Sequence, residues 1–248
     1  MLSNPIIEQL KSMKLNGMAE ALSEQWQENS TSSLSFEDRL GLLVDREHGL
    51  RINRLLQSRL RQAKLHITQA SLADIDYQKE RALNKQHIAE LATGQWLEAH
   101  QNVVLTGATG TGKSYLACAL GHKACMLGCS VRYWRLSRLL EELDLAKGDG
   151  RYLTMMKALA RVKLLIIDDW GMLKIQGQHQ QMILDILDDR YQKQSTLTTS
   201  QLPIAGWYEQ IKDATFADSI LDRLLGQSQL LQLSGPSMRT RKTQREKN

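Results

Sequence analysis

Residues 107–114 read Gly107-Ala108-Thr109-Gly110-Thr111-Gly112-Lys113-Ser114, a full match to the G-x-x-x-x-G-K-[ST] pattern of a phosphate-binding loop. The preceding residues 102–106 form a short β-branched run typical of a buried strand, and residues 115–127 are typical of a helix. Glycines let the backbone curl so that N–H groups face phosphate oxygens, and the helix N-terminus adds partial positive charge. Because strand, loop and helix occur in this order, we interpret the stretch as nucleotide-binding rather than as an ordinary glycine-rich turn.

The loop gives expected roles to individual side chains. Lys113 is expected to reach the β- and γ-phosphates of ATP, and the Ser114 hydroxyl is expected to ligate Mg²⁺. Tyr115 follows directly, so it is counted among the expected nucleotide contacts with the rest of the loop. ATP and Mg²⁺ are therefore the predicted cofactors.

A second candidate site lies at the end of another apolar run. Residues 162–167 are apolar apart from Lys163, and Asp168 and Asp169 follow them. In a parallel sheet both carboxylates fall at the carboxyl edge, where doubly wound folds bind ligands. Asp168 is expected to hold Mg²⁺, directly or through water, and Asp169 to orient and deprotonate an attacking water. Alone, this pattern also fits a strand running into a turn; downstream of a phosphate-binding loop it predicts an ATPase.

A third strand candidate, residues 195–200, ends in polar residues and is closed by Leu202-Pro203. If it lies beside the strand that carries the two acids, Ser200 or Gln201 falls near the γ-phosphate. An amide there would position water, the role called sensor 1. The alternative is ordinary polarity at the end of a strand.

Composition sets limits on the class of protein. The 248 residues are 42% hydrophobic, the formal net charge is +5 and the pI is near 9.1, so nucleic acid is a candidate partner. We find neither a run of 18 apolar residues nor the pattern of a signal peptide. Three cysteines form no paired framework. We therefore expect a cytoplasmic protein with no membrane-spanning segment.

The order of the predicted elements suggests an α/β fold. Strand candidates alternate with helices from residue 102 onward, at 102–106, 130–134, 163–168, 195–200 and 229–233, which predicts a parallel five-stranded sheet. Residues 1–68 contain no strand candidate and are expected to form a helical N-terminal domain. We assign 69–101 to a connector with a helix, and 102–248 to the ATPase domain.

One helix of the N-terminal region is strongly basic on one side. Ser35 and Asp38 resemble a capping box that starts a helix running from Phe36 to about Leu65. Its basic side carries Arg51, Arg54, Arg61 and Lys64. These residues form either a solvated face or a face that contacts DNA phosphates. A DNA path over the ATPase domain would instead use residues such as Arg132, Arg135 and Lys147.

Taken together, these features resemble the IstB-like ATPases, helper proteins of bacterial insertion-sequence transposases related to the DnaC-type helicase loaders. Beyond the phosphate-binding loop, the resemblance rests on three runs, Asp168-Asp169-Trp170-Gly171, Thr199-Ser200-Gln201-Leu202-Pro203 and Leu221-Asp222-Arg223-Leu224. The N-terminal helices and a Gly235-x-Ser237-Met238-Arg239 tail also look like that family, so the resemblance covers nearly the whole chain.

The resemblance implies an AAA+ ATPase that assembles head to tail, with ATP at each subunit boundary, and that engages duplex DNA when ATP is bound. A contact of this kind repeats into a ring or a spiral. Arg223 matches the arginine finger that points into a neighbour's site; the alternative is a surface ion pair with Asp222 or Asp218. Arg239 matches sensor 2, although Arg241 and Lys242 also make it part of a basic tail.

Two features depart from the broader AAA+ pattern. The second acid is Asp169 where Glu is usual, and only about fifteen residues follow the last strand, so we expect no C-terminal helical lid. The leading functional hypothesis is an ATP-hydrolysing helper that assembles on duplex target DNA and activates a partner transposase. The alternative is a DnaC-like loader acting on a replicative helicase and single-stranded DNA. A small-molecule kinase would leave the basic N-terminal helices unexplained.

Overall fold

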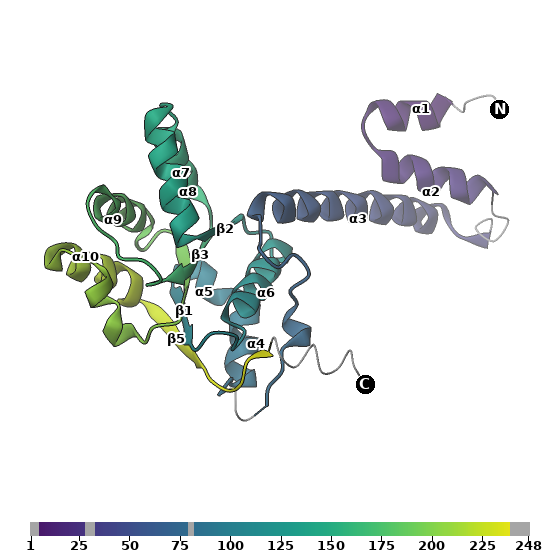
Figure 1. Ribbon diagram of the computed structural model, residues 1–248. Coiled ribbons are helices and arrows are strands. Elements are labelled where there is room, and N and C mark those ends of the chain that lie inside the picture. The colour runs from purple at the N-terminus through teal and green to yellow at the C-terminus, as the bar shows by residue number, and fades with distance from the viewer. Residues whose placement is uncertain (1–4, 28–32, 79–81, 239–248) are drawn as a thin grey trace, which may run out of the picture. The chain divides into compact units, whose positions relative to one another are not determined.

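The computed structural model describes residues 5–27, 33–78 and 82–238 (Figure 1). The chain divides into two compact units, residues 1–58 and 59–248. The first unit contains helices α1 (Pro5–Ser12) and α2 (Asn16–Gln27) and most of the long helix α3 (Phe36–Ala63). None of the helices in the described ranges combines the length and the apolar character needed to cross a bilayer.

Two side chains stabilise the first turns of α3 and α2. The Ser35 hydroxyl accepts a hydrogen bond from the Asp38 backbone N–H at 3.1 Å, so the predicted cap of α3 is confirmed. The buried carboxylate of Glu47, on α3, accepts hydrogen bonds from the backbone N–H groups of Gly17 at 2.7 Å and Met18 at 3.4 Å. A carboxylate supplied by α3 therefore stabilises the positive N-terminus of α2.

The second unit is built on one parallel sheet, as the sequence predicts. Its strand order is β2-β3-β4-β1-β5, and all four pairings are parallel. Each predicted strand is confirmed to within two residues at either end; the observed strands are β1 (Asn102–Gly107), β2 (Val131–Arg135), β3 (Leu164–Trp170), β4 (Ser195–Ser200) and β5 (Ser228–Leu233).

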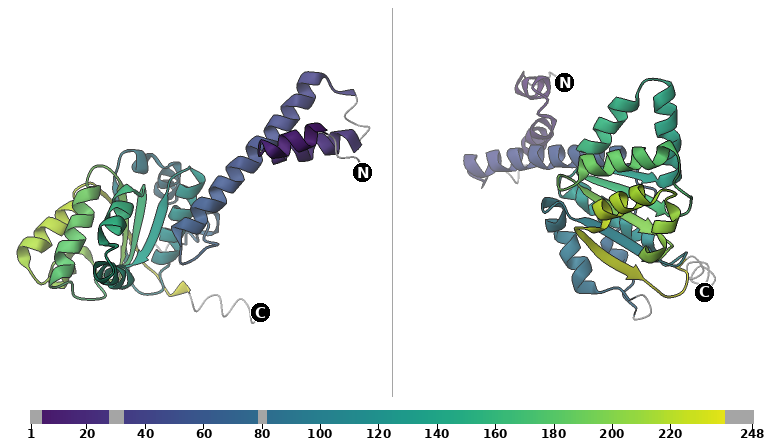
Figure 2. Two further views of the ribbon diagram at one scale, coloured as in Figure 1. Left: turned by 90° about the horizontal axis from the view of Figure 1, so that it is seen from above. Right: turned by 90° about the vertical axis from the view of Figure 1, so that its left-hand side faces the viewer.

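Helices cover both faces of this sheet (Figures 1 and 2). One face packs against α6 (Lys113–Met126), and the other packs against α7, α9 and α10. The remaining bounds are α4 (Lys85–Thr93), α5 (Gln95–Glu98), α7 (Leu136–Gly148), α8 (Tyr152–Arg161), α9 (Gln178–Arg190) and α10 (Ala214–Leu225). Short 3₁₀ turns lie at Leu72–Asp74, Ile204–Gly206 and Tyr208–Gln210.

The first four residues of β3 are apolar because both faces of this strand are buried. Leu165 and Ile167 of β3 belong to the core under α7, α9 and α10, while Ile166 between them lies against Gly121 of α6. Trp170 and Trp207 pack with ring centroids 5.6 Å apart, just beyond the carboxyl end of the sheet. Trp170 ends β3 and Trp207 follows β4, so this packing ties together the ends of these two strands, which carry part of the candidate site.

Candidate nucleotide-binding site

The phosphate-binding loop joins β1 to α6, as predicted. Gly107 has φ of 143° and Gly110 has φ of 84°, both in the left-handed region that favours glycine. A Cβ at Gly107 would overlap the Leu233 carbonyl of β5, and one at Gly110 would overlap the Ser237 side chain. The loop is thus packed closely against the C-terminal strand and the residues after it.

Lys113 begins α6 and folds back over the loop. Its side chain is almost fully buried, and Nζ donates to the carbonyls of Gly107 at 2.7 Å and Ala108 at 2.8 Å. Thr111 closes the same turn, because its hydroxyl donates to the Ala108 carbonyl at 2.8 Å. The ammonium group is therefore held inside the loop, where phosphate oxygens would lie.

Asp168 is the centre of a buried polar cluster. Its Oδ1 accepts hydrogen bonds from the Ser114 hydroxyl at 3.0 Å and from the Thr199 hydroxyl, and its Oδ2 accepts one from Tyr133. Burial, together with the hydrogen bond to Asp168, raises the pKa of Tyr133, so the phenol remains a donor. Ser114 and Asp168 thus present a hydroxyl and a carboxylate side by side, the hard oxygen ligands that Mg²⁺ prefers.

Thr199 and Tyr133 are members of this cluster that the sequence analysis missed. Tyr133 is on β2 and Thr199 is on β4, the two strands that flank β3. Arg135 of β2 is paired with Asp168 of β3, and Thr198 of β4 is paired with Ile167 of β3. The hydroxyl of Thr199 could have indicated a partner for Asp168, but only once β4 was known to lie beside β3.

Asp169 lies in a backbone irregularity at the end of β3. Its φ is 63°, and its N–H donates to the Thr199 hydroxyl at 3.2 Å. Burial and the adjacent Asp168 carboxylate raise the pKa of Asp169, while Arg135 and Lys113 oppose this shift. Nε of Arg135 is 3.7 Å from the Asp169 carboxylate.

Gln201 and Ser200 are placed differently. Gln201 accepts a hydrogen bond from the Thr109 hydroxyl at 2.5 Å, so its amide reaches the phosphate-binding loop. Ser200 is fully buried, donates to the Trp170 carbonyl at 2.8 Å and accepts from the Leu202 N–H at 3.1 Å. Of the two candidates, only Gln201 lies at the loop; the Ser200 hydroxyl stabilises the turn after β4.

These side chains border one cavity of about 240 Å³. Its wall includes Tyr115, whose hydroxyl accepts a hydrogen bond from the Ser71 N–H at 3.2 Å, and Met238, whose N–H donates to the Gly110 carbonyl at 2.9 Å. The other lining residues are Ile67, Thr109, Gly110, Gly112, Lys113, Ser114, Asp169 and Gln201. Arg239, the sensor 2 candidate, lies outside the described residues.

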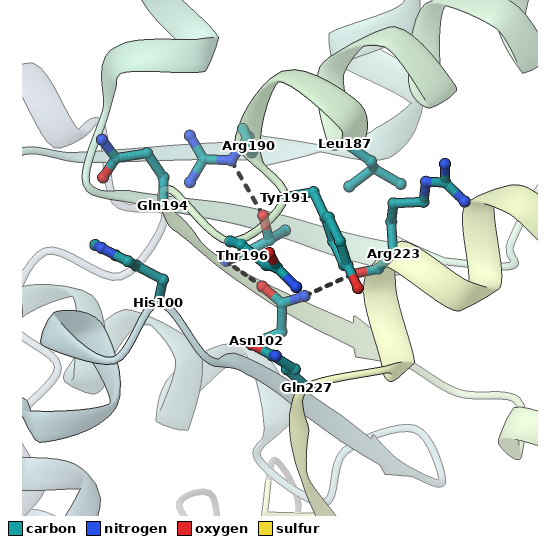
Figure 3. A pocket seen from close by; sticks show the side chains of 10 residues that line it. His100, Asn102, Leu187, Arg190, Tyr191, Gln194, Thr196, Arg223 and Gln227 are labelled. Atoms are coloured by element: carbon teal, nitrogen blue, oxygen red, sulfur yellow. Dashed lines mark hydrogen bonds between the residues drawn. The ribbon is translucent and has the colours of Figure 1, made fainter.

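Arg223 lies near the amino end of β1, whereas this cavity lies beyond the carboxyl end of the same strand. Figure 3 shows Arg223 beside Asn102. The side chain of Asn102, at the start of β1, donates to the Arg223 carbonyl, whereas the phosphate-binding loop follows the other end of the same strand. Nε of Arg223 pairs with Asp188 at 2.6 Å and Nη1 with Asp222 at 3.4 Å. Asp222 was one of the two predicted partners; Asp188 was not predicted.

The residues predicted to contact DNA belong to both units, with Arg51 and Arg54 in the first and the others in the second. Arg51, Arg54, Arg61 and Lys64 are exposed, but Arg51 pairs with the buried Glu47 at 2.7 Å, and Lys64 lies just beyond the end of α3. Arg132 donates to the Gln62 carbonyl at 2.9 Å and lies over the Trp134 ring. Arg135 lies beside Asp169, in the candidate nucleotide site.

The fold and this cluster define a P-loop nucleotide-binding domain of the AAA+ type. The fold resembles that of the DnaC helicase loader, with a TM-score of 0.57 at 19% identity over 66% of this chain and 97% of that structure. The chain belongs to the family of IstB-like ATP binding proteins, which it matches over residues 8–246.

Relatives of similar length carry the same description. The chain is 46% identical to an insertion sequence ATP-binding protein of Sinorhizobium fredii, over 100% of both chains. It is 45% identical to the ATP-binding protein of insertion sequence IS1162 of Pseudomonas fluorescens, over 82% of this chain and 88% of the relative.

Proposed function

We propose that the protein hydrolyses ATP while assembled on duplex DNA, and that it helps a partner transposase encoded by an insertion sequence to use that DNA. The observation that carries this proposal is the cluster at the ends of β1, β3 and β4, where Lys113, Ser114, Asp168, Asp169 and Gln201 converge. Membership of the family and the insertion-sequence names of the relatives support the link to transposition.

The geometry supports hydrolysis by attack of water on the terminal phosphate. Lys113 would neutralise the phosphate oxygens, and Gln201 would orient the water. Asp169 would accept the proton of that water as the new P–O bond forms and the bond to the departing ADP oxygen breaks. Mg²⁺ held by Ser114 and Asp168 would neutralise further phosphate charge. The raised pKa of Asp169 makes its carboxylate a better proton acceptor.

Arg223 supports a form of this assembly in which neighbouring subunits share each nucleotide site. It cannot serve the nucleotide of its own subunit, because the length of β1 separates it from the phosphate-binding loop. A neighbouring subunit that docks its loop against this edge would receive the guanidinium at its phosphates. Such a contact uses two different surfaces and repeats from subunit to subunit.

Arg223→Ala is expected to lower turnover about a hundredfold, because one charge-stabilising group is lost in the transition state. ATP affinity of isolated subunits, measured by calorimetry, should not change. Mixing this variant with Lys113→Ala should restore part of the activity, since some interfaces then pair an intact loop with an intact arginine. Absence of recovery at every mixing ratio would place the arginine's action within one subunit.

DNA binding tests the role of α3. With ATP, we expect binding to duplex DNA to be largely independent of sequence and to weaken with salt, with a log–log slope of about −0.9 per phosphate contact. Replacing Arg54 and Arg61 together with Ala should flatten the slope by roughly two. Arg46→Ala is the matched control, because Arg46 lies on the same helix but already pairs with Glu24 at 3.0 Å.

Two results would contradict this assignment. An unchanged slope in the double variant would favour a solvated helix face, or a DNA path over Arg132, Arg135 and Lys147 in the second unit. Tighter binding to single-stranded than to duplex DNA would favour a helicase loader over a transposition helper.

A further inference from the structure

The side chain of Arg223 is held by the end of a neighbouring helix. Nε donates to Oδ1 of Asp188 at 2.6 Å, and the guanidinium carbon lies 5.9 Å from the centroid of the Tyr191 ring. Asp188 is in the last turn of α9, and Tyr191 follows that helix directly. The end of α9 and the residue after it therefore hold the guanidinium through one N–H group and one ring contact.

The backbone of Arg223 is fixed as well (Figure 3). Nδ2 of Asn102 donates to the carbonyls of Arg223 at 2.9 Å and Leu224 at 3.1 Å, while its Oδ1 accepts from the Thr196 N–H at 2.8 Å. A single amide thus ties the last turn of α10 to the first residues of β1 and β4. A shift of the helix end that carries Arg223 would break hydrogen bonds of this amide.

The space behind the side chain is closed. The cavity bordered by Arg223, Tyr191, His100 and Gln194 measures about 10 Å³, which is room for about one water molecule. A guanidinium group does not fit into it. Arg223 remains about one-third exposed, so its outer edge faces away from the subunit.

We propose that Asp188 is a positioning residue, which orients Arg223 so that the edge formed by its two Nη atoms is presented to the nucleotide of a neighbouring subunit. This inference rests on the proposed function. The Nε–carboxylate bond leaves the Nη edge to bind a phosphate, once Nη1 exchanges its 3.4 Å contact with the exposed Asp222 for the anion. Guanidinium groups bind phosphate in a two-pronged geometry. Holding the long side chain in place beforehand also lowers the entropy lost when the contact forms.

The test is the rate of ATP hydrolysis by the full chain with duplex DNA, measured for Asp188→Ala and Asp188→Asn with Arg223 present or replaced by Ala. Asp188→Ala should lower turnover about tenfold to a hundredfold through misplacement of the arginine, with unchanged ATP affinity of isolated subunits. Asp188→Asn should retain most of the activity, because its Oδ1 still accepts the Nε hydrogen bond. In the Arg223→Ala background, Asp188→Ala should have no further effect.

Asp189→Ala is the matched control, since it removes the same charge from an exposed side chain at the next position of α9. It should leave turnover within about twofold of wild type. A similar loss in this control would assign the effect to surface charge and overturn the proposal. An additive loss in the Arg223→Ala background would assign Asp188 a purely structural role.

Two further outcomes separate this inference from the function on which it rests. Faster turnover in Asp188→Ala would mean that the carboxylate restrains Arg223 rather than presenting it. If Arg223→Ala lowers turnover but Asp188→Ala does not, only the role of Asp188 is wrong. If Arg223→Ala itself leaves turnover unchanged, the shared site is wrong and the role of Asp188 falls with it.

Discussion

Lys113→Ala is expected to abolish ATP binding at ordinary concentrations, with affinity falling by about a hundredfold to a thousandfold. The structure gives two reasons. The ammonium is the positive group held inside the loop, and it also satisfies the carbonyls of Gly107 and Ala108. Its loss removes the attraction for phosphate and leaves two carbonyls facing the anion. Titration calorimetry with ATP and Mg²⁺ measures the effect directly.

A lysine elsewhere on the same helix supplies the control. Lys123 lies in the last turn of α6, at the other end from the loop, so Lys123→Ala should bind ATP as wild type does. Both variants should unfold at similar temperatures if the effect is local. Binding by Lys113→Ala within a few-fold of wild type would remove the basis for assigning this loop to a nucleotide.

Asp169→Asn is expected to separate binding from hydrolysis. Ser114 and Asp168 remain in place to hold Mg²⁺, so ATP affinity should be retained. Turnover should fall about a hundredfold to ten-thousandfold, the range for removal of a general base. The variant should therefore accumulate as an ATP-bound assembly on duplex DNA.

The measurement pairs a phosphate-release assay with sedimentation or electron microscopy of the DNA-bound species. Asn retains the shape of Asp and its tolerance of a positive φ, so loss of activity cannot be attributed to a rearranged backbone. Arg135→Ala is an informative companion, because it removes the cation 3.7 Å from the Asp169 carboxylate and keeps the carboxylate itself. Equal turnover in wild type and Asp169→Asn would place the base elsewhere.

The parts of the site that follow from one continuous stretch of chain could be predicted from the sequence. The loop of residues 107–114 and the acids at the end of β3 depend on local patterns, and the structure places them together at one edge of the sheet. The sheet itself was predictable because short strand-like runs alternate with helical segments from residue 102 onward.

The remaining parts depend on contacts between distant segments. Thr199 reaches Asp168 only because β4 lies beside β3, and Asp188 reaches Arg223 only because α9 packs on α10. Glu47 stands between Arg46 and Arg51 in the sequence, yet it is buried and holds the start of α2. Charge along a sequence does not reveal which side chains turn inward.

The positive φ of Asp169 has a consequence for how this site tolerates substitution. Left-handed backbone is adopted readily by glycine, asparagine and aspartate, and at a cost by longer side chains. Asp169→Glu would lengthen the side chain by one methylene and would also strain the turn. The longer carboxylate therefore does not by itself predict faster hydrolysis. The backbone at this position accommodates Asn or Gly, neither of which can act as a base, whereas Glu would require the turn after β3 to adjust.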